Sequence, residues 1–132
     1  MNAQSKAGPA ELSLVALLAI GVWWLVLGWN WDVVPAGTPN DFTDPHSTLD
    51  WVLVGIAVLV GAAWLGLRGR PFAAVLMVVV PIVALSAWRM ADAETIGANL
   101  WPIGALVLLL AYGATAAAGS VLGLVVRRAR AK

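Results

Sequence analysis

The sequence is poor in the residues on which most soluble proteins and many enzymes depend. Cysteine is absent, which excludes disulfide bonds, thiol redox chemistry and thiolate metal sites. Charged residues make up 11% of the 132 residues, whereas a soluble domain carries about 25%. With hydrophobic residues at 61%, the chain has too little polar surface for a water-soluble fold. We therefore expect lipid to be the solvent for most of it.

Ionisable side chains are also missing from the middle of every long apolar run. No Asp, Glu, Lys or His lies there, and the single histidine, His46, belongs to a polar segment. Proton and ion transport through membranes usually depends on such buried groups. Haem ligation or a Schiff base would need histidine or lysine within a span. We expect no cofactor, no catalytic residue and no enzymatic activity, and the net charge of +1 predicts no nucleic-acid partner.

Four apolar runs are long enough to cross a bilayer. A helix rises about 1.5 Å per residue, so a span needs about 20 mostly apolar residues. The expected fold is an all-α integral membrane protein, a four-transmembrane-helix bundle that forms a single domain. The expected spans are residues 12–31, 49–67, 72–88 and 100–126, joined by loops 32–48 and 89–99 on one side and by 68–71 on the other.

The charged residues divide between the two sides of this four-span arrangement. Basic residues lie before the first span, between the second and third, and after the fourth, whereas the opposite side carries six carboxylates and one cation, Arg89. Because cytoplasmic loops are enriched in lysine and arginine, both termini are expected in the cytoplasm. Arginine outnumbers lysine, and alanine, valine, glycine and leucine dominate, which indicates a GC-rich bacterial genome. The expected location is the bacterial cytoplasmic (inner) membrane.

The two halves of the chain resemble each other where they leave and re-enter the membrane, which suggests two tandem helical hairpins. The exits are Leu27-Gly28-Trp29 and Leu85-Ser86-Ala87-Trp88, and the re-entries run from Trp51 to Gly55 and from Trp101 to Gly104. The alternative is that any four-span protein with aromatic belts has this pattern. Ser86-Ala87-Trp88, with the Trp…Gly re-entry, resembles the SPW-repeat family of small bacterial membrane proteins. Alanine replaces the proline of that motif, the first half lacks it, and the resemblance implies no particular activity.

A stripe of small residues on the fourth span is the strongest interaction signal. Ala111, Thr115, Gly119 and Gly123 recur every four residues. Small residues at this spacing let two helix backbones approach closely, which is a main route to helix association in lipid. We expect this stripe to be either a helix-packing face within the bundle or an interface with a partner protein.

Arg89 is the lone cation on the acidic side, at the end of the third span. Its long side chain can reach outward and pair with Asp92 or Glu94. Alternatively, it contacts an anionic lipid headgroup or a carboxylate of a partner protein.

The segment from residue 41 to residue 50 concentrates polar groups. It holds the carboxylates Asp41, Asp44 and Asp50 together with His46. Oxygen ligands with one imidazole suit a divalent cation. The same groups could also serve an enzyme that acts on lipids, which is the least favoured of the functions considered for this chain. The spacing matches no known metal motif, and Ser47 with Asp50 forms an S-x-x-D capping pattern ahead of a helix. We assign no metal site here and expect a polar turn that leads into a cap.

The absence of buried charge and the small-residue faces favour a non-enzymatic accessory or scaffold subunit of a larger membrane complex. The alternative is a small homo-oligomeric transporter or channel, because four short helices enclose little of a pore alone and a row of polar residues would be needed. The expected partners are membrane lipids and either a membrane protein or further copies of the chain. The basic tail from residue 127 to residue 132 is expected to bind anionic lipid.

Overall fold

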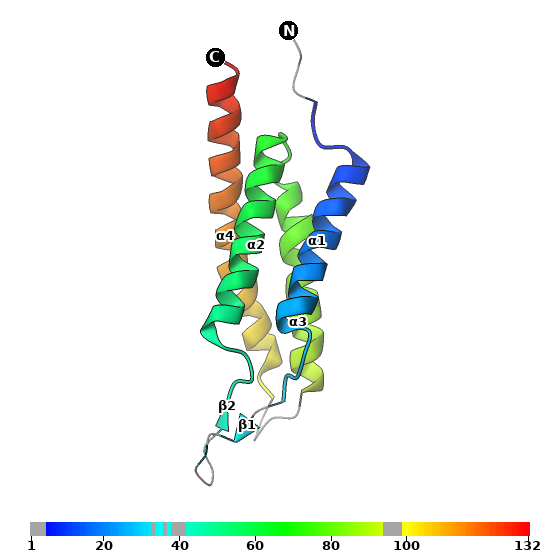
Figure 1. Cartoon of the computed structure of the whole chain (residues 1–132), viewed down its shortest axis with the longest axis vertical. Helices are drawn as coiled ribbons and strands as arrows, with labels where there is room; N and C mark the ends of the chain where they lie inside the picture. Colours follow the sequence, from blue (N-terminus) through cyan, green and yellow to red (C-terminus); the bar gives the residue numbers. More distant parts are fainter. Residues whose placement is uncertain (1–4, 33, 36, 38–41, 94–98) are drawn as a thin grey trace.

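The computed structural model describes residues 5–32, 34–35, 37, 42–93 and 99–132. The chain forms long helices joined by short connections, with one two-residue antiparallel strand pair in the described part (Figure 1). The elements are α1 (Pro9–Leu27), β1 (Val34–Pro35), β2 (Phe42–Thr43), α2 (Thr48–Leu67), the π-helical turn η1 (Val75–Val79), α3 (Val80–Asp92) and α4 (Trp101–Arg130). With η1 and α3 taken as one continuous helix, four helices are long and apolar enough to cross a membrane. The expected helical class and the expected number of long apolar helices are therefore confirmed.

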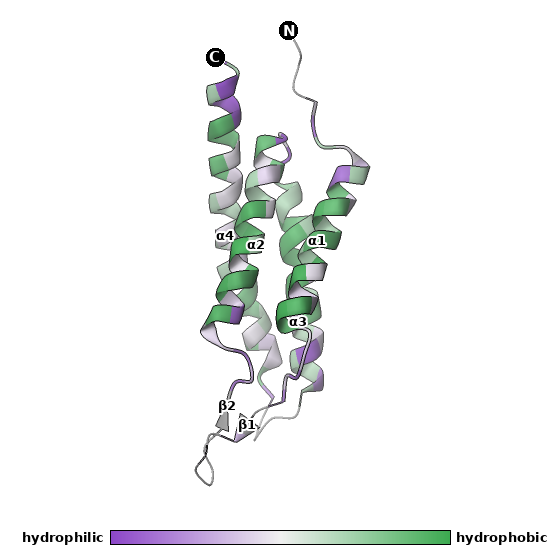
Figure 2. Cartoon of the chain, viewed as in Figure 1, coloured by the Kyte–Doolittle hydropathy of each residue, from purple (hydrophilic) through white to green (hydrophobic). Residues whose placement is uncertain are grey.

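The helices pack as a bundle in which α2 and α4 share the most extensive contact. The α1 helix packs on α2 and on the continuous η1–α3 helix, and that helix also contacts α4. The start of α1 and the end of α4 lie at the same end of the bundle (Figure 1). Hydrophilic residues gather at the two ends and hydrophobic residues fill the middle of each helix (Figure 2).

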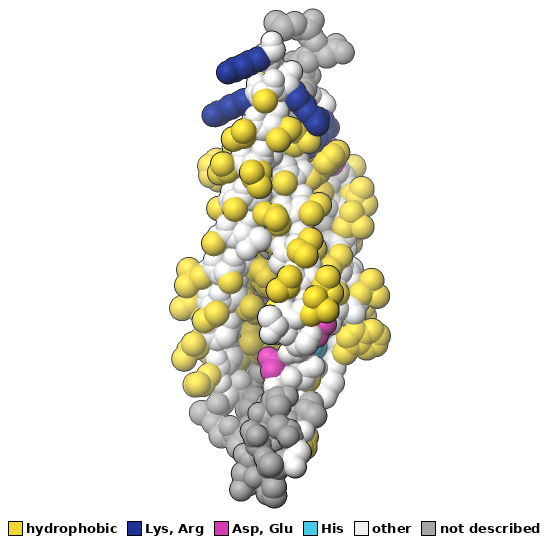
Figure 3. Space-filling model, turned by 60° about the vertical axis from the view of Figure 1, so that its left-hand side comes forward, with side chains coloured by type: hydrophobic (Ala, Val, Ile, Leu, Met, Phe, Trp, Pro, Cys, Tyr) yellow, Lys and Arg dark blue, Asp and Glu magenta, His cyan; other side chains and the backbone are white. Residues whose placement is uncertain are grey.

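We name the two ends of the bundle by their charge. The basic end holds the start of α1, the end of α4 and the turn between α2 and η1, with Lys6, Arg68, Arg70 and the arginines that end α4. The acidic end holds the connections from α1 to α2 and from α3 to α4. Figure 3 shows the separation on one face, with Lys and Arg near one end, a broad hydrophobic belt, and Asp, Glu and His toward the other.

Helix boundaries differ from the expected spans for local reasons. The first helix begins at Pro9, before the expected residue 12, because Gly8 provides the extended N-cap and proline is favoured in the first helical turn. It ends at Leu27, before the expected residue 31, and Gly28 is its C-cap. The fourth helix continues past residue 126 to Arg130, since cations in a last turn interact favourably with the helix dipole. At 30 residues, it is about 45 Å long and extends beyond its neighbours at the basic end (Figure 1).

The start of α2 confirms the capping pattern expected from the sequence. The Ser47 side chain accepts a hydrogen bond from the Asp50 backbone N–H at 3.3 Å, and the Asp50 carboxylate accepts one from the Ser47 N–H at 2.8 Å. This reciprocal capping box satisfies two N–H groups that the helix itself leaves unpaired. It also holds the Asp50 carboxylate at the acidic end, beside the chain that precedes α2.

The core is narrow because each helix keeps a broad apolar face outward. Its large fully buried side chains come from α1, α2 and the continuous η1–α3 helix and include Trp23, Leu27, Val54, Val58, Leu65, Val79 and Ile82. Many large apolar side chains remain exposed along every helix. Such a continuous exposed belt would be unfavourable in water, and it forms the wide hydrophobic zone seen in Figure 3.

Candidate functional site

An aromatic cluster of Trp23, Trp31, His46 and Trp51 lies at the acidic end of the bundle. The Trp31 ring stacks on Trp23 at a centroid distance of 6.3 Å and meets the edges of His46 at 4.8 Å and Trp51 at 5.7 Å. Trp23 Nε1 donates a 2.8 Å hydrogen bond to Ser86 Oγ, which ties α1 to α3 in the buried core. The cluster therefore fixes the chain that follows α1 against the chain that precedes α2.

His46 lies between two of these tryptophans and is nearly buried. Its side chain is 8% exposed, and its backbone N–H donates a 2.8 Å hydrogen bond to Asp44 Oδ1. The ring nitrogen Nε2 is buried without a hydrogen-bond partner in the part of the chain that the structure describes. A buried nitrogen of this kind is costly to leave unpaired, so the position marks a place where a ligand group would be stabilising.

The electrostatic environment keeps this imidazole neutral. Burial lowers the pKa of His46 below its ordinary value of 6.5; the carboxylates of Asp44 and Asp50 oppose that shift, and the guanidinium of Arg89 adds to it. Desolvation is the dominant cause because a charged imidazolium loses its water among the tryptophan rings. At neutral pH, His46 is therefore a neutral hydrogen-bonding group.

This pKa shift predicts a pH-dependent stability. The unfolded chain binds the proton more tightly than the folded one, so the free energy of unfolding is expected to fall as the pH drops below about 6.5 toward the lower folded pKa. The measurement is detergent-solubilised thermal unfolding between pH 7.5 and pH 5. A His46→Phe variant keeps the aromatic contact without the titrating nitrogen and should lose this dependence. An identical pH profile in the wild type and the variant would contradict the assignment to His46.

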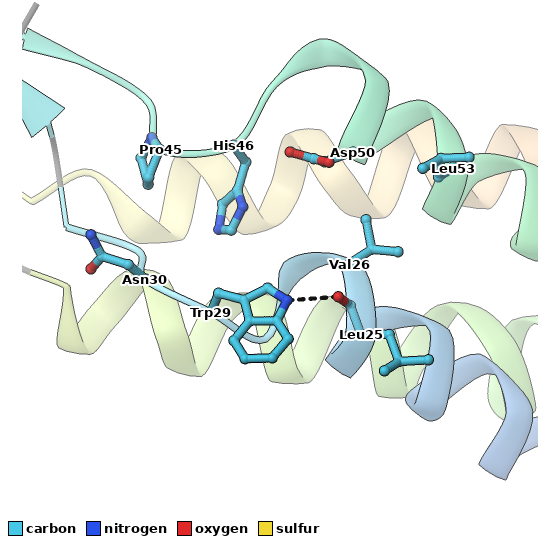
Figure 4. Close-up of a pocket in the computed structure, with 8 residues that line it drawn as sticks. All are labelled: Leu25, Val26, Trp29, Asn30, Pro45, His46, Asp50 and Leu53. Atoms are coloured by element: carbon cyan, nitrogen blue, oxygen red, sulfur yellow. Dashed lines mark hydrogen bonds between the residues drawn. The ribbon is translucent and has the colours of Figure 1, made fainter.

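An open pocket of about 560 Å³ lies beside His46, between the end of α1 and the start of α2 (Figure 4). Polar side chains lie toward the connection, from Asn30, His46 and Asp50. Apolar side chains continue along the two helices, from Leu25, Val26 and Leu53, with Trp29 and Pro45 beside them. The pocket is therefore amphipathic along its length, which suits a molecule with a polar head and an apolar tail.

Arg89 lies at the same end and links α3 to the end of α1. Its Nη2 donates a 2.9 Å hydrogen bond to the Trp29 backbone carbonyl, and its guanidinium carbon lies 5.7 Å from the centroid of the Trp88 ring. Within the described residues it forms no ion pair with Asp92, and Glu94 lies outside them. Its Nε is buried and unpartnered in that same part of the chain. Contact with a lipid or a partner protein stays a prediction.

The polar segment before α2 does not assemble a metal site within the described residues. Asp44, His46 and Asp50 belong to no group of three such side chains that could hold a metal ion. Asp41, the other carboxylate considered for such a site, lies outside the described residues. Asp44 and Asp50 instead accept backbone hydrogen bonds that shape the turn and cap α2.

The expected small-residue stripe on α4 divides between two environments. Gly119 and Gly123 are buried against α2, where a Cβ on Gly119 would lie 2.5 Å from the Leu59 carbonyl oxygen. Thr115 is half-buried and donates a hydrogen bond to the Ala111 carbonyl within α4, and Ala111 is exposed. Two members of the stripe thus lie at the α2–α4 contact, and Ala111 turns away from it.

The outward face of α4 carries a second set of small residues, of which the sequence stripe contains only Ala111. Ala111, Ala114, Ala117 and Ala118 are all exposed. Leu106, Val107 and Leu110 precede them, and Val121, Leu122 and Val125 follow, all of them large and exposed. We call this alanine surface between two bulky ones the α4 notch. The signal for it in the sequence is the spacing of Ala111, Ala114 and Ala118 at i, i+3 and i+7. Only the structure shows that these alanines face outward and not toward the other helices.

A polar clamp at the basic end was also missed by sequence reasoning. The Glu11 carboxylate accepts hydrogen bonds from Arg68 Nε at 2.8 Å, Arg68 Nη2 at 3.0 Å and Trp64 Nε1 at 2.8 Å. The bidentate pair holds the first turns of α1 against the end of α2. The carboxylate raises the pKa of Arg68, which stays charged. The sequence contains one signal for it, because both residues fall at the same end of adjacent spans.

Fold and site together define a small four-helix protein with apolar helices of membrane-spanning length, a polar-to-apolar pocket at one end and an exposed small-residue notch on its longest helix. No family model, no curated protein and no solved structure matches this chain. The partial likeness of Ser86-Ala87-Trp88 to the SPW-repeat motif therefore carries no family assignment.

Proposed function

We propose that the protein is a multi-pass protein of the bacterial cytoplasmic membrane with both termini in the cytoplasm. Two features support this. The apolar belt around the bundle matches the dimensions of a bilayer. Every lysine and arginine except Arg89 lies at the end that holds the start of α1 and the end of α4, which is the pattern of cytoplasmic segments.

Within that membrane, we propose a non-enzymatic accessory or scaffold role in a larger membrane complex. The observation that carries the proposal is the α4 notch. Lipid chains make little van der Waals contact with a flat alanine surface. Another helix can pack closely against the same surface and make van der Waals contact along its length. The α2 helix already uses the opposite face, where Gly119 and Gly123 lie, so the notch is available to a partner.

The buried polar groups favour this role over a pore within one chain. In the described core, Ser86 pairs with Trp23, and Ser120 Oγ donates to the Pro71 carbonyl at 3.2 Å. Tyr112 Oη donates to the Trp51 carbonyl at 3.2 Å. These groups are paired one by one across helix contacts and do not form a polar row that ions could follow. A transport path would have to lie between copies of the chain, packed through the same notch.

Filling the notch tests this role. In an Ala114→Leu, Ala118→Leu double variant, the added side chains would hold a partner helix away from α4, and recovery of the partner should fall at least about tenfold. The measurement is mild-detergent extraction from the native host followed by native-mass analysis of what remains bound. An Ala84→Leu variant, on the exposed face of α3, is the matched control and should keep the partner.

The outcomes separate the two functions. A different membrane protein that is retained by the control and lost by the double variant supports the accessory role. A second copy of this chain with the same dependence supports the homo-oligomer, and liposome flux assays then test transport. Equal recovery with the filled and unfilled notch would contradict both.

A further inference from the structure

We propose that the pocket between α1 and α2 binds the head of an aminophospholipid, with the primary ammonium at the Asp50 carboxylate and the start of an acyl chain along Leu25 and Leu53. The proposal concerns a different surface from the α4 notch. It can hold or fail whatever the notch binds.

The charge of the pocket selects a cation over an anion. Asp50 is the one formally charged group among the residues that line it. One Asp50 oxygen accepts the Ser47 N–H, and a carboxylate with about four acceptor positions has room for more donors. Trp29 also lines the site, and an electron-rich aromatic ring favours a cationic head.

The unpartnered nitrogen of His46 selects the kind of cation. The imidazole lines the pocket, is 8% exposed and has a buried Nε2 with no partner among the described residues. In Figure 4 the ring lies between Pro45 and Asp50 and extends toward Trp29. Because the imidazole lines the pocket, it is among the polar groups that an entering head would meet. A primary ammonium has N–H groups to donate to that nitrogen, whereas a trimethylammonium has none.

The apolar end of the pocket favours a lipid over a soluble amine, which has no apolar chain to place there. Leu25, Val26 and Leu53 continue from the polar groups along the belt-facing surfaces of α1 and α2 (Figure 4). Leu25 and Leu53 are 70% and 42% exposed, so they can cover the first carbons of an acyl chain. The polar groups lie at the water end and the leucines lie deeper, in the same order as the parts of a phospholipid.

Lipid titration of the purified protein by native mass spectrometry tests the assignment. Phosphatidylethanolamine and phosphatidylcholine with identical acyl chains carry the same charge and differ only at the head nitrogen, where three N-methyl groups of the choline lipid replace three N–H donors. We expect the ethanolamine lipid to bind at least about tenfold more tightly, the change expected for one charge-assisted hydrogen bond. Soluble phosphoethanolamine should not displace it.

Variants separate pocket chemistry from folding. Asp50→Asn should remove the preference and His46→Phe should reduce it. Ser47→Ala disrupts the same capping box but leaves the carboxylate, and should keep the preference. Unchanged near-ultraviolet circular dichroism shows that each variant is folded.

Three results would overturn the proposal. The first is equal binding of the two lipids by the wild type. The second is that Ser47→Ala and folded Asp50→Asn lose the preference for the ethanolamine lipid to the same extent. That result would assign the preference to the capping box and not to the Asp50 carboxylate. The third is tighter binding of phosphatidylglycerol, which would assign the site to an anionic head. None of these results bears on the notch, so the two proposals are tested separately.

Discussion

Replacing Gly123 with alanine is expected to destabilise the bundle by about 2–3 kcal/mol. A Cβ at this position would lie 2.5 Å from the Leu67 backbone nitrogen and even closer to the Ala63 carbonyl oxygen. Both are backbone atoms that cannot rotate away, so α2 and α4 would have to separate along the most extensive helix contact of the protein. The measurement is unfolding by sodium dodecyl sulfate in mixed micelles, followed by tryptophan fluorescence.

Gly113 provides the matched control for that result. It lies on the same helix, and a Cβ added there meets nothing within 4 Å. Gly113→Ala should therefore stabilise α4 by about 0.5–1 kcal/mol, because alanine loses less backbone entropy on folding. If Gly123→Ala and Gly113→Ala shift the free energy of unfolding in the same direction, the prediction is wrong, and Gly123 is not needed for the close approach of α2 and α4.

Replacing Trp23 with alanine is expected to cost about 3–5 kcal/mol. The side chain is completely buried among α1, α3 and the aromatic cluster, and its removal leaves a cavity as well as an unpaired Ser86 hydroxyl. Ser86→Ala should cost less, about 1–3 kcal/mol, because it only deprives the indole N–H of its acceptor. The same micelle titration measures both variants and the double variant.

The adjacent Trp24 is the control for Trp23. It is 54% exposed on the outer face of α1, so Trp24→Ala should change the free energy of unfolding by less than about 1 kcal/mol. Equal effects at the two positions would mean that α1 is rotated relative to this structure. The aromatic cluster and the pocket next to it would then be incorrect as well.

The notch and the pocket place two kinds of contact on different parts of the molecule. The notch lies along α4 in the middle of the apolar belt, where helices associate through small residues. The pocket lies between α1 and α2 at the acidic end, where polar and apolar side chains of the protein adjoin. The proposed accessory role and the proposed lipid site therefore use separate surfaces of the molecule.

The sequence by itself determined the features that depend on local composition. The number of helices follows from the lengths of the apolar runs, which need no knowledge of neighbouring segments. The capping box at Ser47 and Asp50 follows from a four-residue pattern and is confirmed. The separation of basic and acidic ends follows from charge order along a chain that reverses direction with each helix.

Only the tertiary structure decided how each helix is rotated and what it faces. Helices that are apolar on all sides carry no periodic signal that distinguishes the inner from the outer face. For this reason the sequence left open whether Trp23 or Trp24 is buried, and it did not resolve which small residues of α4 face α2. The pocket combines Leu25 with Leu53 and His46, and the clamp joins Glu11 to Arg68. Such sites depend on contacts between residues far apart in sequence, which packing between helices selects.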